Sequence, residues 1–157
     1  MLNEILAKLN QNEKLVGGGA AVAVVGWVLG LVLTSGWYDH SGAMMTGLIA
    51  LIASIAIIVV LYLKFAPNSS VQWPAPVVLI LFGLAVAAAI FALLGLVQAL
   101  TYDPLGGLGQ YCTALGQNLC PSKPITLYLV VLVVAGGAAA AAYGSYMEWV
   151  AAGKPTK

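Results

Sequence analysis

Cys112 and Cys120 are the two residues whose type and spacing most directly suggest covalent chemistry. Seven residues separate them, within a stretch at 101–124 that contains several prolines and glycines. Two cysteines in one exported loop are typical of a disulfide, and closing so short a ring contributes about 2.5 kcal/mol in the chain-entropy model. We therefore expect a Cys112–Cys120 disulfide. Two free thiols are the alternative, which requires the loop to face a reducing compartment.

Asp39, His40 and Asp103 are the candidate metal ligands, because carboxylates combined with one imidazole suit a divalent ion. The three residues lie on two different loops, and such a scattered set is more typical of polar groups at a lipid-headgroup surface. We therefore expect no metal. His40 is the only histidine in the chain, so no second histidine offers an axial ligand for haem or chlorophyll inside a membrane. No cofactor is expected.

The composition determines which architecture must carry these loops. Of the 157 residues, 62% are hydrophobic and 7% are charged, with a net charge of +1, whereas a soluble domain carries about 25% charged residues. These values exclude a disordered segment, a soluble core and a nucleic-acid partner, which would need a basic stripe. Uncharged apolar stretches lie at 16–33, 43–63, 77–100 and 125–146. A helix of about 20 apolar residues crosses a bilayer, so the sequence predicts an all-α integral membrane protein, a four-transmembrane-helix bundle.

Prolines mark the ends of the predicted spans. Pro76 and Pro124 suit the first turn of a helix, and Pro67 and Pro104 follow the second and third spans. Before the first span, the apolar residues of 1–15 share one helical face, which predicts a short amphipathic helix at the membrane surface. A partner-docking helix is the alternative for this segment. The chain therefore divides into this helix (1–15), a membrane domain (16–146) with an outer loop at 101–124, and a cytoplasmic tail (147–157).

The lysines predict the orientation, since cytoplasmic loops of membrane proteins carry an excess of lysine and arginine. With the N-terminus inside, five of the six lysines face the cytoplasm and Lys123 alone lies outside. We therefore expect both termini to be cytoplasmic. Short loops and the lack of eukaryotic sorting motifs favour a bacterial or archaeal cell membrane.

Small residues are concentrated in the first and fourth predicted spans. In lipid, small side chains let helix backbones approach closely, and this contact drives helix association. We expect these two helices to pack tightly in the cytoplasmic half of the bilayer. The residues that we expect at this packing surface are Gly18, Gly19, Gly26, Gly30, Gly136, Gly137, Ala140 and Gly144.

The spans contain no Asp, Glu, Lys, Arg or His, although a proton-coupled transporter needs a buried titratable group. Ser54 is expected to donate to a carbonyl of its preceding turn, and Glu148 to be solvated at a helix end. We therefore expect a non-enzymatic structural or accessory subunit of a membrane complex, or a self-associating scaffold. Its partners would be the lipid bilayer and other membrane subunits or further copies of the chain. The alternative is a small-molecule- or lipid-handling protein, or a pore formed by oligomerisation.

The chain resembles quinone-linked thiol oxidoreductases of the vitamin K epoxide reductase type in having four predicted helices and an exported cysteine pair. The resemblance implies redox activity, and we keep such an enzyme as a further alternative. Those enzymes pass electrons to quinone through a Cys-x-x-Cys pair, which this sequence lacks. We therefore expect no enzymatic activity and assign no catalytic residue.

Overall fold

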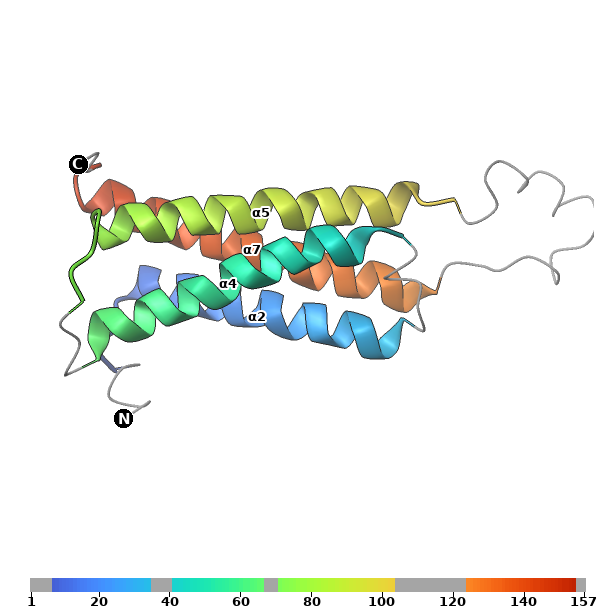
Figure 1. The fold of residues 1–157 in the computed structure, drawn as a ribbon, viewed down its shortest axis with the longest axis horizontal. Helices are drawn as coiled ribbons and strands as arrows, with labels where there is room; N and C mark the ends of the chain where they lie inside the picture. Colours follow the sequence, from blue (N-terminus) through green and yellow to red (C-terminus); the bar gives the residue numbers. More distant parts are fainter. Residues whose placement is uncertain (1–6, 35–40, 67–70, 104–123, 155–157) are drawn as a thin grey trace, which may run out of the picture.

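The computed structural model describes residues 7–34, 41–66, 71–103 and 124–154. In these residues the chain forms helices and no strand, and the helices run alternately up and down as an antiparallel bundle (Figure 1). The long helices are α2 (Gln11–Leu33), α4 (Ala43–Phe65), α5 (Val77–Thr101) and α7 (Ile125–Ala151). The start of α2 and the end of α7 lie at the same end of the bundle. Because that end carries Lys8, Lys14, Lys64 and Lys154, we call it the lysine end.

Each of these four helices is long and apolar enough to cross a membrane. Their outward faces carry large apolar side chains, such as Val32 and Ile125, which are 72% and 73% exposed. Such surfaces are costly in water and favourable in hydrocarbon. The described part of the chain is therefore all-helical, with four helices that have the length and apolar surface of membrane spans, as the sequence predicts.

The start of α2 lies before the first apolar residue of the predicted span. Asn10 has extended backbone geometry and caps the helix. Its Oδ1 accepts from the Glu13 N–H at 2.8 Å, and its own N–H donates to Glu13 Oε2 at 2.9 Å. This capping box satisfies two donors that a helix start otherwise leaves free. Residues 11–15, which the sequence analysis placed in the interfacial helix, therefore belong to α2, and residues 1–6 lie outside the described part of the chain.

The end of α7 also differs from the predicted span, because the helix continues past residue 146 to Ala151. Gly153 has a φ of 79°, a left-handed conformation that glycine adopts without strain. Its N–H donates to the Val150 carbonyl at 3.1 Å, and the Lys154 N–H donates to the Trp149 carbonyl at 3.0 Å. These two bonds form a Schellman motif, which ends the helix.

Alanine and glycine fill the centre of the bundle. The most extensive helix–helix contact joins α2 to α7, and α5 packs against both α4 and α7. Larger apolar residues, including Ile57 and Leu81 near the lysine end and Leu127 near the opposite end, are fully buried. The middle layer is almost entirely alanine: its buried residues are Ala23, Ala50, Ala53, Ala88, Ala92, Val134, Ala135 and Ala138. Such a layer draws the helix backbones together.

Polar side chains inside the bundle are mostly bonded to backbone carbonyls. The Trp27 indole N–H donates to the Met44 carbonyl at 3.4 Å, linking α2 to α4. The Thr34 hydroxyl donates to the Gly30 carbonyl at 2.6 Å. Ser54 corrects our expectation, because its Oγ is fully buried and has no hydrogen-bond partner in the described residues. Its hydroxyl therefore does not satisfy itself on the preceding turn.

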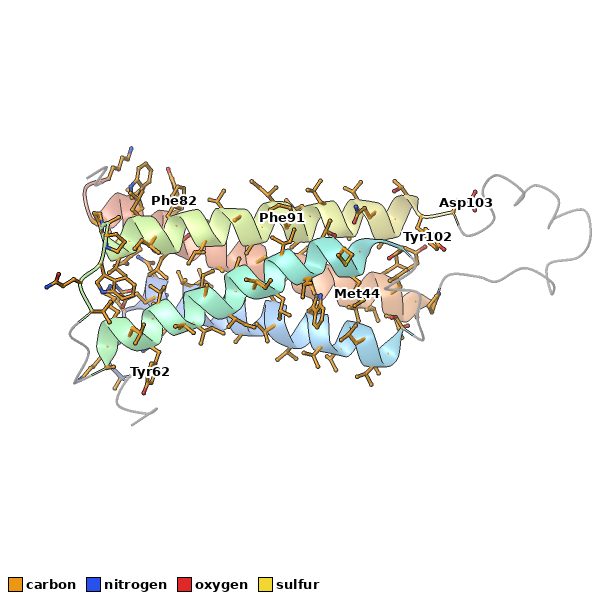
Figure 2. All side chains as sticks on the ribbon, viewed as in Figure 1. Met44, Tyr62, Phe82, Phe91, Tyr102 and Asp103 are labelled. Carbon is orange, nitrogen blue, oxygen red and sulfur yellow. The ribbon has the colours of Figure 1, made fainter. Side chains whose placement is uncertain are left out.

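Aromatic side chains gather at the lysine end. The Phe82 and Trp149 rings stack with centroids 5.2 Å apart, and Tyr146 lies tilted against both rings. The Lys154 ammonium lies 5.9 Å from the centroid of the Trp149 ring. Tyr62 lies toward this end too, whereas Tyr102 and Asp103 follow α5 at the opposite end (Figure 2). Tryptophan and tyrosine are enriched at the boundary between lipid and water, which suits their position at the helix ends.

Candidate functional site

A network of charged and amide side chains joins three helices at the lysine end. Asn10, Asn12 and Glu13 come from the start of α2, Lys64 from the last turn of α4, and Glu148 from the last turns of α7. We call these five residues the polar clamp. It is the largest set of interacting polar side chains that we find in the described residues.

The Glu13–Lys64 ion pair is the buried half of the polar clamp. The Lys64 ammonium donates to Glu13 Oε1, and the two side chains are 27% and 3% exposed respectively. Each charge also lies where its own helix favours it, with the carboxylate in the first turn of α2 and the ammonium in the last turn of α4. The Lys64 ammonium also lies 5.3 Å from the centroid of the Phe65 ring. The pair therefore ties α2 to α4.

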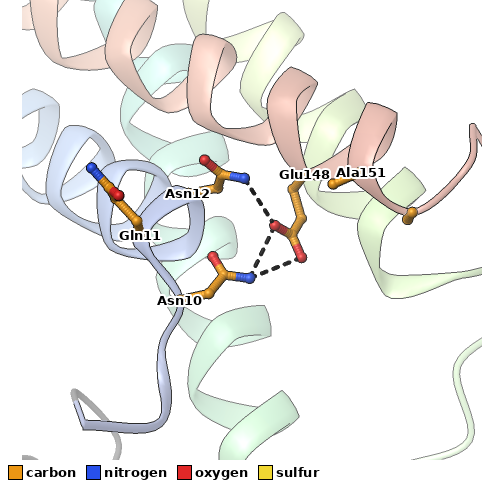
Figure 3. Close-up of a pocket in the computed structure, with 6 residues that line it drawn as sticks. Asn10, Gln11, Asn12, Glu148 and Ala151 are labelled. Carbon is orange, nitrogen blue, oxygen red and sulfur yellow. Dashed lines mark hydrogen bonds between the residues drawn. The ribbon is translucent and has the colours of Figure 1, made fainter.

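Glu148 forms the half of the polar clamp that faces solvent. Asn10 Nδ2 donates to both of its carboxylate oxygens, at 3.1 and 3.0 Å, and Asn12 Nδ2 donates to Oε2 at 3.4 Å (Figure 3). Since Asn10 also bonds to Glu13, one asparagine connects the carboxylates of two helices. The chain of contacts runs from α7 through α2 to α4. Glu148 is therefore a partner in a tertiary contact, which corrects our expectation of a merely solvated residue.

The chemistry available at the polar clamp is hydrogen bonding between fixed partners. Both carboxylates accept from nitrogen donors. The described residues contain no group of three potential metal ligands. A shallow pocket of about 470 Å³ opens beside Glu148, lined also by Asn10, Gln11, Asn12, Ala151 and Ala152. We interpret the polar clamp as a set of contacts that fixes the ends of three helices relative to one another.

Glycine contacts extend the junction of α2 and α7 from the polar clamp toward the middle of the bundle. A Cβ added at Gly19 would lie 2.6 Å from both the Ala141 nitrogen and the Gly137 oxygen. A Cβ at Gly137 would lie 2.7 Å from the Ala23 nitrogen, and one at Gly144 would lie 2.9 Å from the Asn12 oxygen. The two backbones therefore touch at spacings that leave no room for a side chain.

The other expected packing residues divide between the inside and the outside of the bundle. A Cβ at Gly26 would meet Val133 at 2.9 Å, and Gly30 is also buried. Gly18 and Gly136 face outward, where an added Cβ would meet nothing within 4 Å, and Ala140 is half-buried. The small residues thus lie on two surfaces. One is buried between helices, and the other faces outward from the described part of the chain.

The chain matches nothing to which we compared it. Comparison with known protein families, curated proteins and solved structures finds no match. Its function must therefore be argued from its own geometry.

The candidate ligands and cysteines cannot be assembled into a site here. Asp39, His40, Cys112 and Cys120 lie outside the described residues. Asp103 is exposed just after α5, at the end opposite the lysine end (Figure 2). The disulfide and the expectation that these residues hold no metal therefore both stay predictions.

The sequence analysis missed the polar clamp, although one of its signals is visible in the sequence. Asn10 is followed three residues later by Glu13, which is the spacing of a capping box before an apolar run. That pattern predicts a helix start at Gln11. It also places Glu13 inside the first long helix, where its burial requires a positively charged partner.

Proposed function

We propose that this protein is a non-enzymatic structural or accessory subunit of a membrane complex, or a self-associating membrane scaffold. The observation that supports this proposal most is the tight packing between helices at the centre of the bundle. The gap between α4, α5 and α7, lined by Ala43, Gly47, Ala92, Gly95, Val131 and Val134, is too narrow to hold a water molecule. A core packed in this way gives a rigid body to which other subunits can attach. It offers no passage at that point for a transported solute.

The outward glycines support a role in assembly. Gly18 on α2, Gly83 on α5 and Gly136 on α7 each face away from the bundle, with open space where a Cβ would be. Small outward residues allow another membrane helix to approach the backbone closely. These positions are therefore the proposed contact surface for a further subunit or a second copy.

A lipid-handling protein is the second candidate, and one feature favours it. A groove of about 560 Å³ lies between the start of α2 and the end of α7, on the outside of the bundle. It is large enough to hold part of a lipid. A lipid-handling protein would have to take up this lipid and release it again. A scaffold would keep the lipid bound.

Native mass spectrometry of the tagged protein, purified in mild detergent at native expression, tests the first proposal. We expect the chain to be recovered with other membrane subunits at fixed stoichiometry, or as a defined homo-oligomer. Replacing the outward Gly136 by leucine should reduce this association, because the added side chain blocks close approach. The buried core should remain intact, since nothing lies within 4 Å of that position. A monomer that carries only lipid would refute the assembly role and favour the second candidate.

We further propose that both termini are cytoplasmic, that the membrane is a prokaryotic cell membrane, and that Cys112 and Cys120 form a disulfide outside. All four described lysines lie at one end of the bundle, which supports this orientation. In spheroplasts, a membrane-impermeant maleimide tag should label no cysteine before reduction. After treatment with a membrane-impermeant phosphine, it should label two. Two labels without reduction would exclude the disulfide, and labelling only after lysis would reverse the orientation.

A further inference from the structure

The groove between α2 and α7 at the lysine end changes in chemistry along its length. We call it the basic groove; it is lined by Gln11, Asn12, Lys14, Leu15, Tyr143 and Met147. Gln11 and Asn12 lie at the very start of α2 and present amide groups. Leu15 lies one helical turn further into the bundle, and Tyr143 lies one turn before Met147 on α7. The groove thus combines polar side chains from the start of α2 with the apolar side chains of Leu15, Tyr143 and Met147.

The apolar residues of the basic groove face outward. Leu15, Tyr143 and Met147 are 39%, 61% and 38% exposed. They lie on helices apolar enough to cross a membrane, so the molecule that covers them comes from the bilayer. Tyrosine is enriched where hydrocarbon meets the lipid headgroups. An occupant must therefore have a polar head and an apolar tail.

Lys14 gives the basic groove its positive charge. The Lys14 side chain is exposed and forms no ion pair within the described part of the chain. The two nearby carboxylates do not line the groove: Glu13 is neutralised by Lys64, and Glu148 accepts from the neutral amides of Asn10 and Asn12. The start of α2 adds partial positive charge from its backbone dipole. The polar part of the groove is therefore complementary to an anionic group.

We propose that the basic groove binds a phospholipid with an anionic headgroup. Lys14 and the Gln11 amide hold the headgroup phosphate, because basic positions between membrane helices attract anionic headgroups. The first part of an acyl chain lies along Leu15, Tyr143 and Met147. The bound lipid covers the seam between α2 and α7 from outside, next to the polar clamp. This site is independent of the proposed role in assembly, since it needs neither a partner subunit nor a second copy.

Lipid retention measured by native mass spectrometry tests the proposal. The full-length protein is incorporated into nanodiscs of phosphatidylglycerol or phosphatidylcholine with identical acyl chains, then released and analysed. We expect phosphatidylglycerol to be retained in preference to phosphatidylcholine. Lys14→Gln should lower that retention about fivefold, the contribution of one lysine near an anionic surface. Lys154→Gln removes the same charge at the same end but outside the groove, and should leave retention unchanged.

Three outcomes would overturn the proposal. Equal retention of the two lipids would remove the need for an anionic headgroup. Equal losses in Lys14→Gln and Lys154→Gln would show that the net charge, rather than the basic groove, holds the lipid. Displacement of the lipid by inorganic phosphate at millimolar concentration would show a site for free phosphate. Circular dichroism of both variants checks that the helices are intact, and is expected to match that of the unmodified protein.

Discussion

Replacing Gly19 by alanine is expected to lower the free energy of unfolding by about 1–3 kcal/mol, the usual cost of overpacking a filled interface. The new methyl group would lie 2.6 Å from backbone atoms of Ala141 and Gly137, and 3.1 Å from the Ala141 Cα. Because these are backbone atoms, no side-chain rotation relieves the contact. The helices α2 and α7 must move apart, which weakens their contact on both sides of the substitution.

Gly18→Ala provides the matched control for Gly19→Ala. The two positions are adjacent in the same helix, yet an added Cβ at Gly18 meets nothing within 4 Å. Its substitution should be neutral, or stabilising by up to about 1 kcal/mol from helix propensity. Gly137→Ala and Gly136→Ala repeat the comparison on α7. Unfolding curves in a detergent titration measure all four variants. Equal effects within each pair would show that the close approach of α2 and α7 is absent in the membrane protein.

Removal of the Lys64 ammonium is expected to have the second large effect. In Lys64→Met, the Glu13 carboxylate loses its counter-charge at a position that is 2% exposed. Removing one partner of a fully buried ion pair lowers the free energy of unfolding by about 3–5 kcal/mol. The partial exposure of Lys64 and the hydrogen bond that the Glu13 carboxylate keeps with the Asn10 N–H reduce the expected loss to about 2–3 kcal/mol.

A double-mutant cycle separates the ion pair from other effects of these substitutions. Glu13→Gln alone should cost less than Lys64→Met, because the ammonium it leaves unpaired reaches solvent. The combined variant should be more stable than the sum of the two single effects predicts, by about 1 kcal/mol or more, as for residues in direct contact. Lys154→Met serves as the control at an exposed lysine and should change stability by less than about 0.5 kcal/mol. Simple additivity of the Glu13 and Lys64 substitutions would contradict the pairing.

The helices themselves are predictable from the sequence because apolar runs and prolines mark them directly. The predicted spans at 43–63, 77–100 and 125–146 begin at the first residues of α4, α5 and α7. Gly42 and the prolines at 76 and 124 occupy the cap positions. The start of α2 and the end of α7 were less predictable, because each helix continues past a charged residue. A search for uncharged stretches stops at Lys14 and Glu148, whereas helical hydrogen bonding continues to the caps.

The polar clamp could not be predicted from composition and spacing alone. Glu13 and Lys64 are 51 residues apart, and Asn10 and Glu148 are 138 apart. Contacts at such separations depend on how the helices pack, which one sequence does not specify. Ser54 is a similar case, because the burial of its hydroxyl depends on how the helices pack against one another. The outward positions of Gly18 and Gly136 likewise follow from the rotation of each helix about its axis.

The junction of α2 with α7 has a consequence for the synthesis of the chain. Asn10 leaves the ribosome 138 residues before the Glu148 to which it bonds. At about 5–20 residues per second, that interval lasts roughly 7–28 s. Throughout it, α2 lacks α7, the helix with which it makes its most extensive contact, and its glycine face is open to other helices with small residues. Slower translation therefore lengthens the interval in which α2 is without the helix that covers its glycine face.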